Sequence, residues 1–168
     1  MEVIVLSLCS LLAVVQTTAS TKVETTFDKS VNFQALRTYT WLRGYDAHHP
    51  EAHKHIVAAL EEEMARLGFT KVAERGDVTL SYYTVMAAEL DLKALDALER
   101  SGQGTAGSAP MKPVGRLLVI MRWPDTADRL WSASTRENVD VDMAKLPATL
   151  RVVTRRLFET YPGKKPRR

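Results

Sequence analysis

The pattern of hydrophobic and polar positions along the chain predicts five strands and two helices. Strand-length segments in which apolar residues alternate or run continuously lie at residues 22–27, 33–42, 77–86, 115–123 and 130–135. The segment 115–123 is apolar on both faces, which is typical of a strand in the middle of a sheet. Apolar residues recur at helical spacing over residues 50–67, and again from about residue 143 or 147 to residue 161.

Start and stop signals bound the two predicted helices. Pro50 suits the first position of a helix, because its missing N–H group would have no partner there. Gly68 is placed as the left-handed residue that follows this helix, and Phe69 comes next to fold back onto the apolar stripe. Pro162 and Gly163 end the second helix.

These elements predict an α+β fold in the order ββαβ–loop–ββα. About five strands form a largely antiparallel or mixed sheet, and both amphipathic helices pack on one face, because there are more strands than helical crossovers. Residues 87–113 form a flexible excursion, whose first part either extends the third strand or forms a short helix. The other sheet face is then solvated, covered by this excursion, or buried against a partner.

Residues 1–20 have the layout of a secretory signal peptide. An apolar run at residues 3–15 precedes small polar residues, and it is shorter than the roughly 20 residues that span a bilayer. A buried N-terminal strand is the alternative, since no lysine or arginine precedes the run. Cleavage would leave a single α+β domain at residues 21–162 and a basic tail at residues 163–168, exported to the periplasm or cell envelope.

Cys9 is the one cysteine of the chain. It lies inside the apolar run with Leu8 before it, so it lacks the sequence context of a lipidated cysteine. Loss of the leader would leave a domain without cysteine, which excludes disulfides, thiol catalysis and cysteine-based zinc sites.

Composition and charge indicate a folded domain that is not embedded in a membrane. Of the 168 residues, 45% are hydrophobic and 26% are charged, and the formal net charge is +3. Four of the last five residues are basic, and such a tail either attracts phosphate groups or simply stays solvated. The other cations are scattered and no nucleic-acid-binding motif is present, so we expect no nucleic-acid partner and at most peripheral membrane association.

Four stretches, taken in order, carry a family likeness. They are Phe33 with Tyr39–Leu42, Met64–Phe69, Asp77–Tyr83, and Gly115–Ile120 followed by Leu130 and Trp131. Together they resemble DUF4136, a bacterial cell-envelope family of unknown function whose members are commonly small exported lipoproteins. The resemblance implies an α+β fold and an envelope compartment, and it implies no activity. This chain departs from the family pattern because no cysteine stands at the expected mature N-terminus.

All four histidines of the chain lie between residues 48 and 55. His49 and His53 are four residues apart, so they could share one helix face and bind Zn²⁺ or Cu²⁺ together with Asp46 or Glu51. The segment lacks the H-E-x-x-H pattern, and a solvated polar helix start is the other interpretation. The chain also lacks a G-x-S-x-G elbow, so we assign no catalytic residue.

Trp41, Tyr83 and Trp131 are the candidate ligand-binding residues. If all three project from the helix-free face of the sheet, they could line an apolar or glycan-binding groove. Packing in the core is the other interpretation, since strand aromatics usually fill that role.

These observations favour a non-catalytic, exported cell-envelope module that needs no cofactor. Such a module would bind or scaffold a protein, glycan or lipid component of the envelope through its sheet face or edge. The alternative is a small metal-binding or hydrolytic periplasmic enzyme that uses His48–His55. A third hypothesis is a structural domain that associates with itself.

Overall fold

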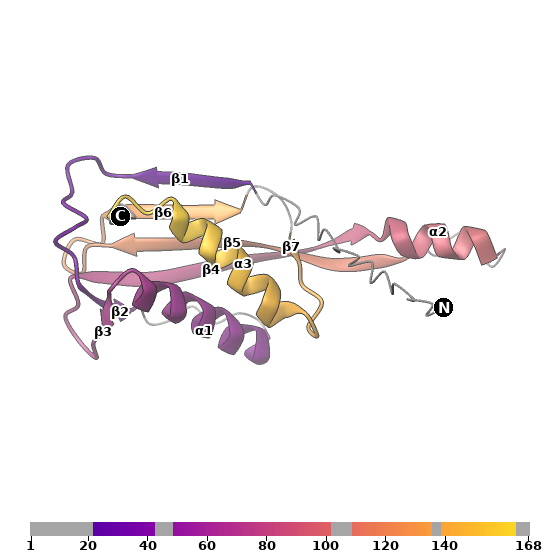
Figure 1. The fold of residues 1–168 in the computed structure, drawn as a ribbon, viewed down its shortest axis with the longest axis horizontal. Helices are drawn as coiled ribbons and strands as arrows, with labels where there is room; N and C mark the ends of the chain where they lie inside the picture. The colour runs from indigo at the N-terminus through magenta and orange to yellow at the C-terminus, as the bar shows by residue number, and fades with distance from the viewer. Residues whose placement is uncertain (1–21, 43–48, 102–108, 136–138, 164–168) are drawn as a thin grey trace, which may run out of the picture.

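The computed structural model describes residues 22–42, 49–101, 109–135 and 139–163 (Figure 1). The strands are β1 (Val23–Phe27), β2 (Thr38–Trp41), β3 (Thr70–Lys71), β4 (Val78–Leu90), β5 (Met111–Arg122), β6 (Arg129–Thr135) and β7 (Val139–Asp140). The helices are α1 (Pro50–Arg66), α2 (Leu92–Ser101) and α3 (Leu146–Glu159).

The seven strands form one mixed sheet in the order β1-β6-β5-β4-β2-β3, with β7 paired to β5. The neighbours β1, β6, β5 and β4 are antiparallel, whereas β2 is parallel to both β4 and β3. The predicted α+β fold with a mixed sheet is confirmed. The predicted number of about five strands is too low, because β3 and β7 have two residues each and are too short to show a hydrophobic period.

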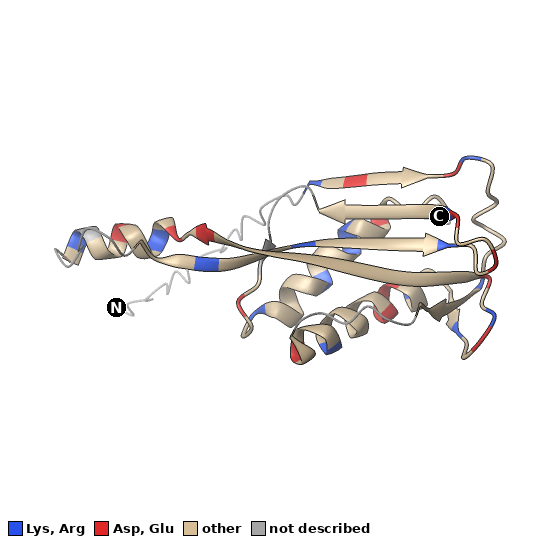
Figure 2. Cartoon of the chain, turned by 180° about the vertical axis from the view of Figure 1, so that it is seen from behind, with Lys and Arg blue, Asp and Glu red and all other residues tan. Residues whose placement is uncertain are grey.

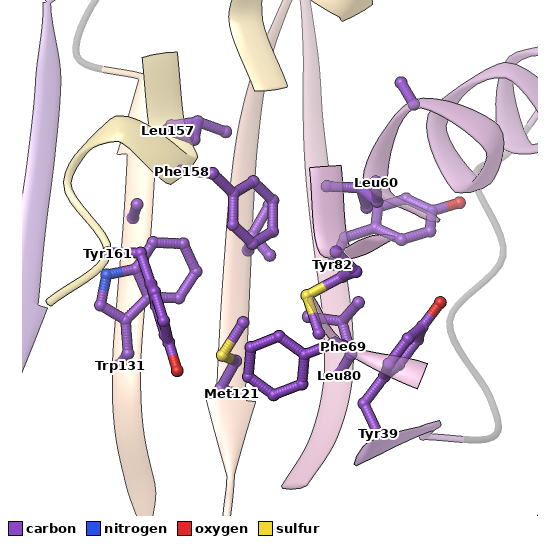
Figure 3. Close-up of a cluster of buried hydrophobic side chains, with 14 of the residues drawn as sticks. Tyr39, Leu60, Phe69, Leu80, Tyr82, Met121, Trp131, Leu157, Phe158 and Tyr161 are labelled. Atoms are coloured by element: carbon purple, nitrogen blue, oxygen red, sulfur yellow. The ribbon is translucent and has the colours of Figure 1, made fainter. Parts of the chain in front are cut away.

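Helices α1 and α3 cover one face of the sheet, as predicted, while α2 stands apart from both (Figure 1). The core lies between these two helices and the sheet (Figure 3). Leu60 of α1, Leu157 and Phe158 of α3, and Leu80 and Trp131 of the sheet have 0% of their surface exposed. The rings of Trp131 and Phe158 lie 5.2 Å apart between centroids, so the two layers interlock through aromatic contacts.

The boundaries of α1 confirm the sequence signals. The helix begins at Pro50, and Gly68, two residues beyond its end, has φ +88° in the left-handed region that favours glycine. The backbone N–H of Phe69 donates to the carbonyl of Met64 at 3.0 Å, and the Phe69 side chain is buried. The chain therefore folds back onto α1 as predicted.

The first part of the predicted excursion at residues 87–113 forms both of the structures that the sequence allowed for it. β4 continues to Leu90, α2 follows directly, and β5 begins at Met111, so extension of the strand and a short helix both occur. The pairing of β4 with β5 continues without a break from Thr79–Arg122 to Leu90–Met111. Within the excursion, residues 102–108 lie outside the described residues.

The predicted signal peptide at residues 1–20 and most of the basic tail lie outside the described residues. Within the described part of the chain, no helix has both the length and the apolar character needed to cross a membrane.

Candidate functional site

The far halves of β4 and β5, together with α2, form an arm that projects beyond the body of the domain (Figure 1). We define the arm as residues 85–101 and 109–116. Within the described residues, the 85–90 stretch of β4 pairs with β5 alone. The facing stretch of β5 also pairs with β7, but only at Val114 and Gly115. The arm is therefore a two-stranded ribbon with a helix at its end.

The arm exposes an unusual share of the large apolar side chains. Nine such side chains are exposed among the described residues, and five of them lie on the arm. These are Val85 (64% exposed), Met86 (53%), Leu90 (40%), Leu92 (63%) and Met111 (56%). Met86, Leu90 and Met111 lie on one face of the ribbon and Val85 on the other. A concentration of exposed apolar side chains in one region is typical of a contact surface, since single ones are scattered over ordinary surfaces.

Among the described residues, few contacts stabilise helix α2. It has ten residues, whereas isolated helices shorter than about 12–15 residues are marginal in water. Asp91 caps it, because its Oδ1 accepts a hydrogen bond from the Ala94 N–H at 3.1 Å. Leu95 and Leu98 remain half-buried, and Leu92 is exposed. The helix therefore presents apolar side chains that no helix of the body covers.

An apolar pocket of about 400 Å³ lies at the root of the arm. It is bounded by the first turns of α1 and α3, by β4 and β5 where they leave the body, and by the segment that precedes α3. Its buried lining includes Ile56, Leu117, Leu150 and Val153. The volume falls within the roughly 300–1,000 Å³ that is usual for small-molecule sites.

Small residues keep this pocket open. Gly115 is one of them: a Cβ atom there would lie 3.1 Å from Cγ1 of Val141 and 3.3 Å from the sulfur of Met86. Ala52 of α1 is another small lining residue. Met86 and Met143, both lining residues, are 53% and 42% exposed, so two flexible side chains stand at the mouth.

The described lining of the pocket contains no aspartate or glutamate. Its polar residues are His49, Thr84 and Arg116, and Arg116 is paired across the ribbon with Val85, so its side chain belongs to the opposite face from the pocket. An occupant is therefore held by apolar contact, with few polar groups to orient it.

The sequence profile of a domain of unknown function, DUF4136, matches residues 23–163. The chain belongs to the DUF4136 family. The match confirms the resemblance inferred from the four sequence stretches, and the family description carries no activity. A search of curated protein sequences finds no significant match.

Solved structures with similar folds include three that cover most of this DUF4136 domain. A PDZ domain protein from Parabacteroides distasonis has a TM-score of 0.59 at 13% identity over 86% of this chain and 36% of its own, so this chain spans about a third of that protein. A PelC dodecamer from Paraburkholderia phytofirmans has a TM-score of 0.55 at 11% identity, over 88% of this chain and 100% of its own. A DUF4136 family protein from Bacteroides thetaiotaomicron has a TM-score of 0.53 at 13% identity, over 87% of this chain and 98% of its own. At these identities the likeness establishes the fold alone.

The described histidines of this DUF4136 domain do not converge on a metal site. His49 precedes α1 and lines the apolar pocket, whereas His53 shares a hydrogen bond of 2.5 Å between its Nδ1 and the Tyr82 hydroxyl. Glu51, a candidate ligand, is paired with Lys54 at 2.7 Å. Among the described residues no three histidine, cysteine, aspartate or glutamate side chains are grouped as a metal would require, and Asp46 and His48 lie outside them.

The three aromatic candidates do not share a face of the sheet. Trp131 is fully buried in the core, and Trp41 packs against the core and donates from Nε1 to Oε1 of Glu61 at 2.9 Å. Tyr83 lies on the opposite face from its neighbour Tyr82, which is buried in the core. The hypothesis of one groove lined by all three is wrong, because the three side chains do not all project from the helix-free face of the sheet.

The buried charge of the domain serves to join the two covering helices. The Glu63 carboxylate, the buried one among the described residues, lies 2.6 Å from Nη2 of Arg66 and 2.8 Å from Nε of Arg155 on α3. Its hydrogen bond and charge raise the pKa of Arg155. A carboxylate held between two guanidinium groups stabilises packing and is poorly suited to general acid or base catalysis.

Neither the arm nor the pocket was found from the sequence. Most of the arm falls in the segment predicted as a flexible excursion, and residues 85–88 are all apolar, so no alternation marked a longer strand there. The pocket is built from four segments far apart in the chain, and no motif marks it.

Proposed function

We propose that this DUF4136 domain is a non-catalytic interaction module of the cell envelope that assembles with further copies of itself through the arm. The exposed apolar side chains of the arm carry this proposal. They are not part of the core of their own chain, and each costs free energy while it faces water. Contact with another protein would bury them.

A second copy of the chain is the partner that best accounts for this surface. The PelC structure of similar fold is a dodecamer, so a sheet with this topology is compatible with repeated contacts between identical subunits. The layout of residues 1–20 supports export, and with it an envelope location. The lack of a converging set of titratable groups in the described pocket supports a role without catalysis.

Sedimentation equilibrium of the purified protein and of Leu92→Glu tests the proposal. Glutamate in the first turn favours the positive end of α2, so the helix is retained while a charge enters the exposed apolar surface. The wild-type protein is expected to sediment as an assembly, and Leu92→Glu is expected to shift the mass towards that of the monomer.

Leu42→Glu is the matched control, because Leu42 is also exposed but lies at the end of β2 in the body. It should leave the mass of the assembly unchanged. A wild-type protein that stays monomeric at every concentration, or an assembly that survives Leu92→Glu, contradicts the proposal.

A further inference from the structure

The arm and the pocket are chemically matched to each other. Helix α2 presents Leu92, Leu95 and Leu98, and the pocket is lined by aliphatic side chains around a space of about 400 Å³. Leucine side chains entering this space would replace water on both surfaces. Met86 and Met143 at the mouth can adapt to the shape of what enters, since methionine is unbranched and flexible.

A chain cannot make this contact with its own pocket. The ribbon between the pocket and α2 runs from Val85 to Leu90 and is paired at every position with Arg116 to Met111. At about 3.4 Å per residue it holds the start of α2 roughly 17 Å from the root of the arm. Folding α2 back would break this ladder, so the contact has to be made with another copy.

The two surfaces differ in the sign of their net charge, although most of the basic charge is already paired within the chain. The tip of the arm, residues 89–100, contains four acidic and two basic residues and has a net charge of −2. Residues 145–159, which comprise α3 and the lysine before it, contain four basic residues and one acidic residue and have a net charge of +3. Figure 2 marks these charges on the arm and on the body. Within the chain, however, Lys145 pairs with Asp142, Arg151 with Glu62 and Arg155 with Glu63. Apolar contact with the pocket, rather than charge, is therefore the main attraction for an incoming tip.

From this match we infer that copies of the chain pack head to tail, with α2 of one copy seated in the apolar pocket at the root of the arm of the next. This inference rests on the proposed self-assembly and names the surface that receives the arm. The contact joins two different surfaces, so an open assembly keeps a free arm at one end and a free pocket at the other, and both are occupied only when a ring closes.

Cross-linking between single-cysteine variants tests the contact directly. Every variant carries Cys9→Ser, so the introduced thiol is the only one in the full chain. Ala97→Cys places a thiol on α2, Ala144→Cys places one beside the mouth of the pocket, and Ala65→Cys places one near the far end of α1. All three alanines are exposed. Pairs of variants are mixed and treated with a short bismaleimide.

The mixture of Ala97→Cys with Ala144→Cys is expected to give a cross-linked dimer, and the mixture of Ala97→Cys with Ala65→Cys is not. Ala97→Cys alone is expected to give no dimer. Dimers from Ala97→Cys alone, in a yield that mixing with Ala144→Cys does not raise, would show that arms meet arms. That result overturns the inference and leaves the proposed self-assembly standing. A protein that yields no cross-link and sediments as a monomer overturns both.

Filling the pocket gives a second measurement that does not depend on cysteine chemistry. Ala52→Leu extends a side chain into the pocket, and Ala58→Leu makes the same change at an exposed position of α1 outside the described lining. Ala52→Leu is expected to weaken assembly about tenfold or more, and Ala58→Leu is expected to leave it unchanged. Equal assembly by both variants would contradict the inference.

Discussion

The body and the arm share two strands, yet the same pair of residue types has different surroundings in each. Leu80 and Met121 lie opposite each other in the body and are fully buried. Ten residues further along β4, Leu90 lies opposite Met111 on the same face, and these side chains are 40% and 56% exposed. Alternation thus determines which face a side chain occupies, and burial depends on whether another element covers that face.

The comparison also separates two roles of apolar side chains. In the body they hold α1 and α3 on the sheet, so changes there alter the free energy of unfolding. On the arm they are available to a second protein, so changes there alter association. The predictions below test this division.

Leu80→Ala is expected to give the largest loss of stability. The side chain is fully buried in the core, and removing it loses its transfer free energy and leaves a cavity. The free energy of unfolding should fall by about 2–5 kcal/mol, measured by urea denaturation followed by circular dichroism. Leu80→Met, which nearly conserves volume, should cost less than about 1.5 kcal/mol. A loss of less than about 1.5 kcal/mol for Leu80→Ala would show that this part of the sheet is loosely packed.

Asp77→Asn is expected to have an intermediate effect that depends on pH. The Asp77 carboxylate accepts hydrogen bonds from the backbone N–H groups of Arg37 and Thr38 at 2.8 and 2.9 Å, which join the start of β2 to the start of β4. These bonds, the one from Arg37 first, lower the pKa of Asp77. The charged carboxylate therefore stabilises the folded state above the unfolded pKa of about 4, and this stabilisation is lost as the pH falls through the folded pKa.

The wild-type protein should exceed Asp77→Asn in unfolding free energy by about 1 kcal/mol at pH 7, a low value because Asp77 is exposed. The difference should shrink as denaturation is repeated at decreasing pH below about 4. Asp125→Asn, in the exposed turn between β5 and β6, serves as the control and should change stability little at any pH. A difference for Asp77→Asn that stays constant down to acid pH would rule out the carboxylate as its source.

The amount that could be predicted from the sequence differs between the two regions. Helix α1 and its end were predictable because Pro50, the apolar stripe and Gly68 act locally. The positions of Trp41 and Trp131 were not, because the alternation of a strand does not indicate which face the helices will cover. The arm was missed because residues 85–88 are all apolar, a short run that periodicity alone does not assign to a strand. Nothing local distinguishes a covered ribbon from an exposed one. The pocket depends on how α1, α3 and the two strands pack, which no single segment encodes.

Leu90→Ala is expected to have the smallest effect on stability, and it completes the comparison with Leu80→Ala. The same substitution in the same strand and on the same face removes a side chain that no helix of the body covers. When denaturation is measured at a dilution where the protein is monomeric, the unfolding free energy should change by less than about 0.5 kcal/mol. At concentrations where the chain assembles, sedimentation should show a lower mass than for the wild-type protein, because part of the contact surface is gone. A stability loss for Leu90→Ala close to that of Leu80→Ala in the monomer would mean that the arm belongs to the core, and the division between the two regions would fail.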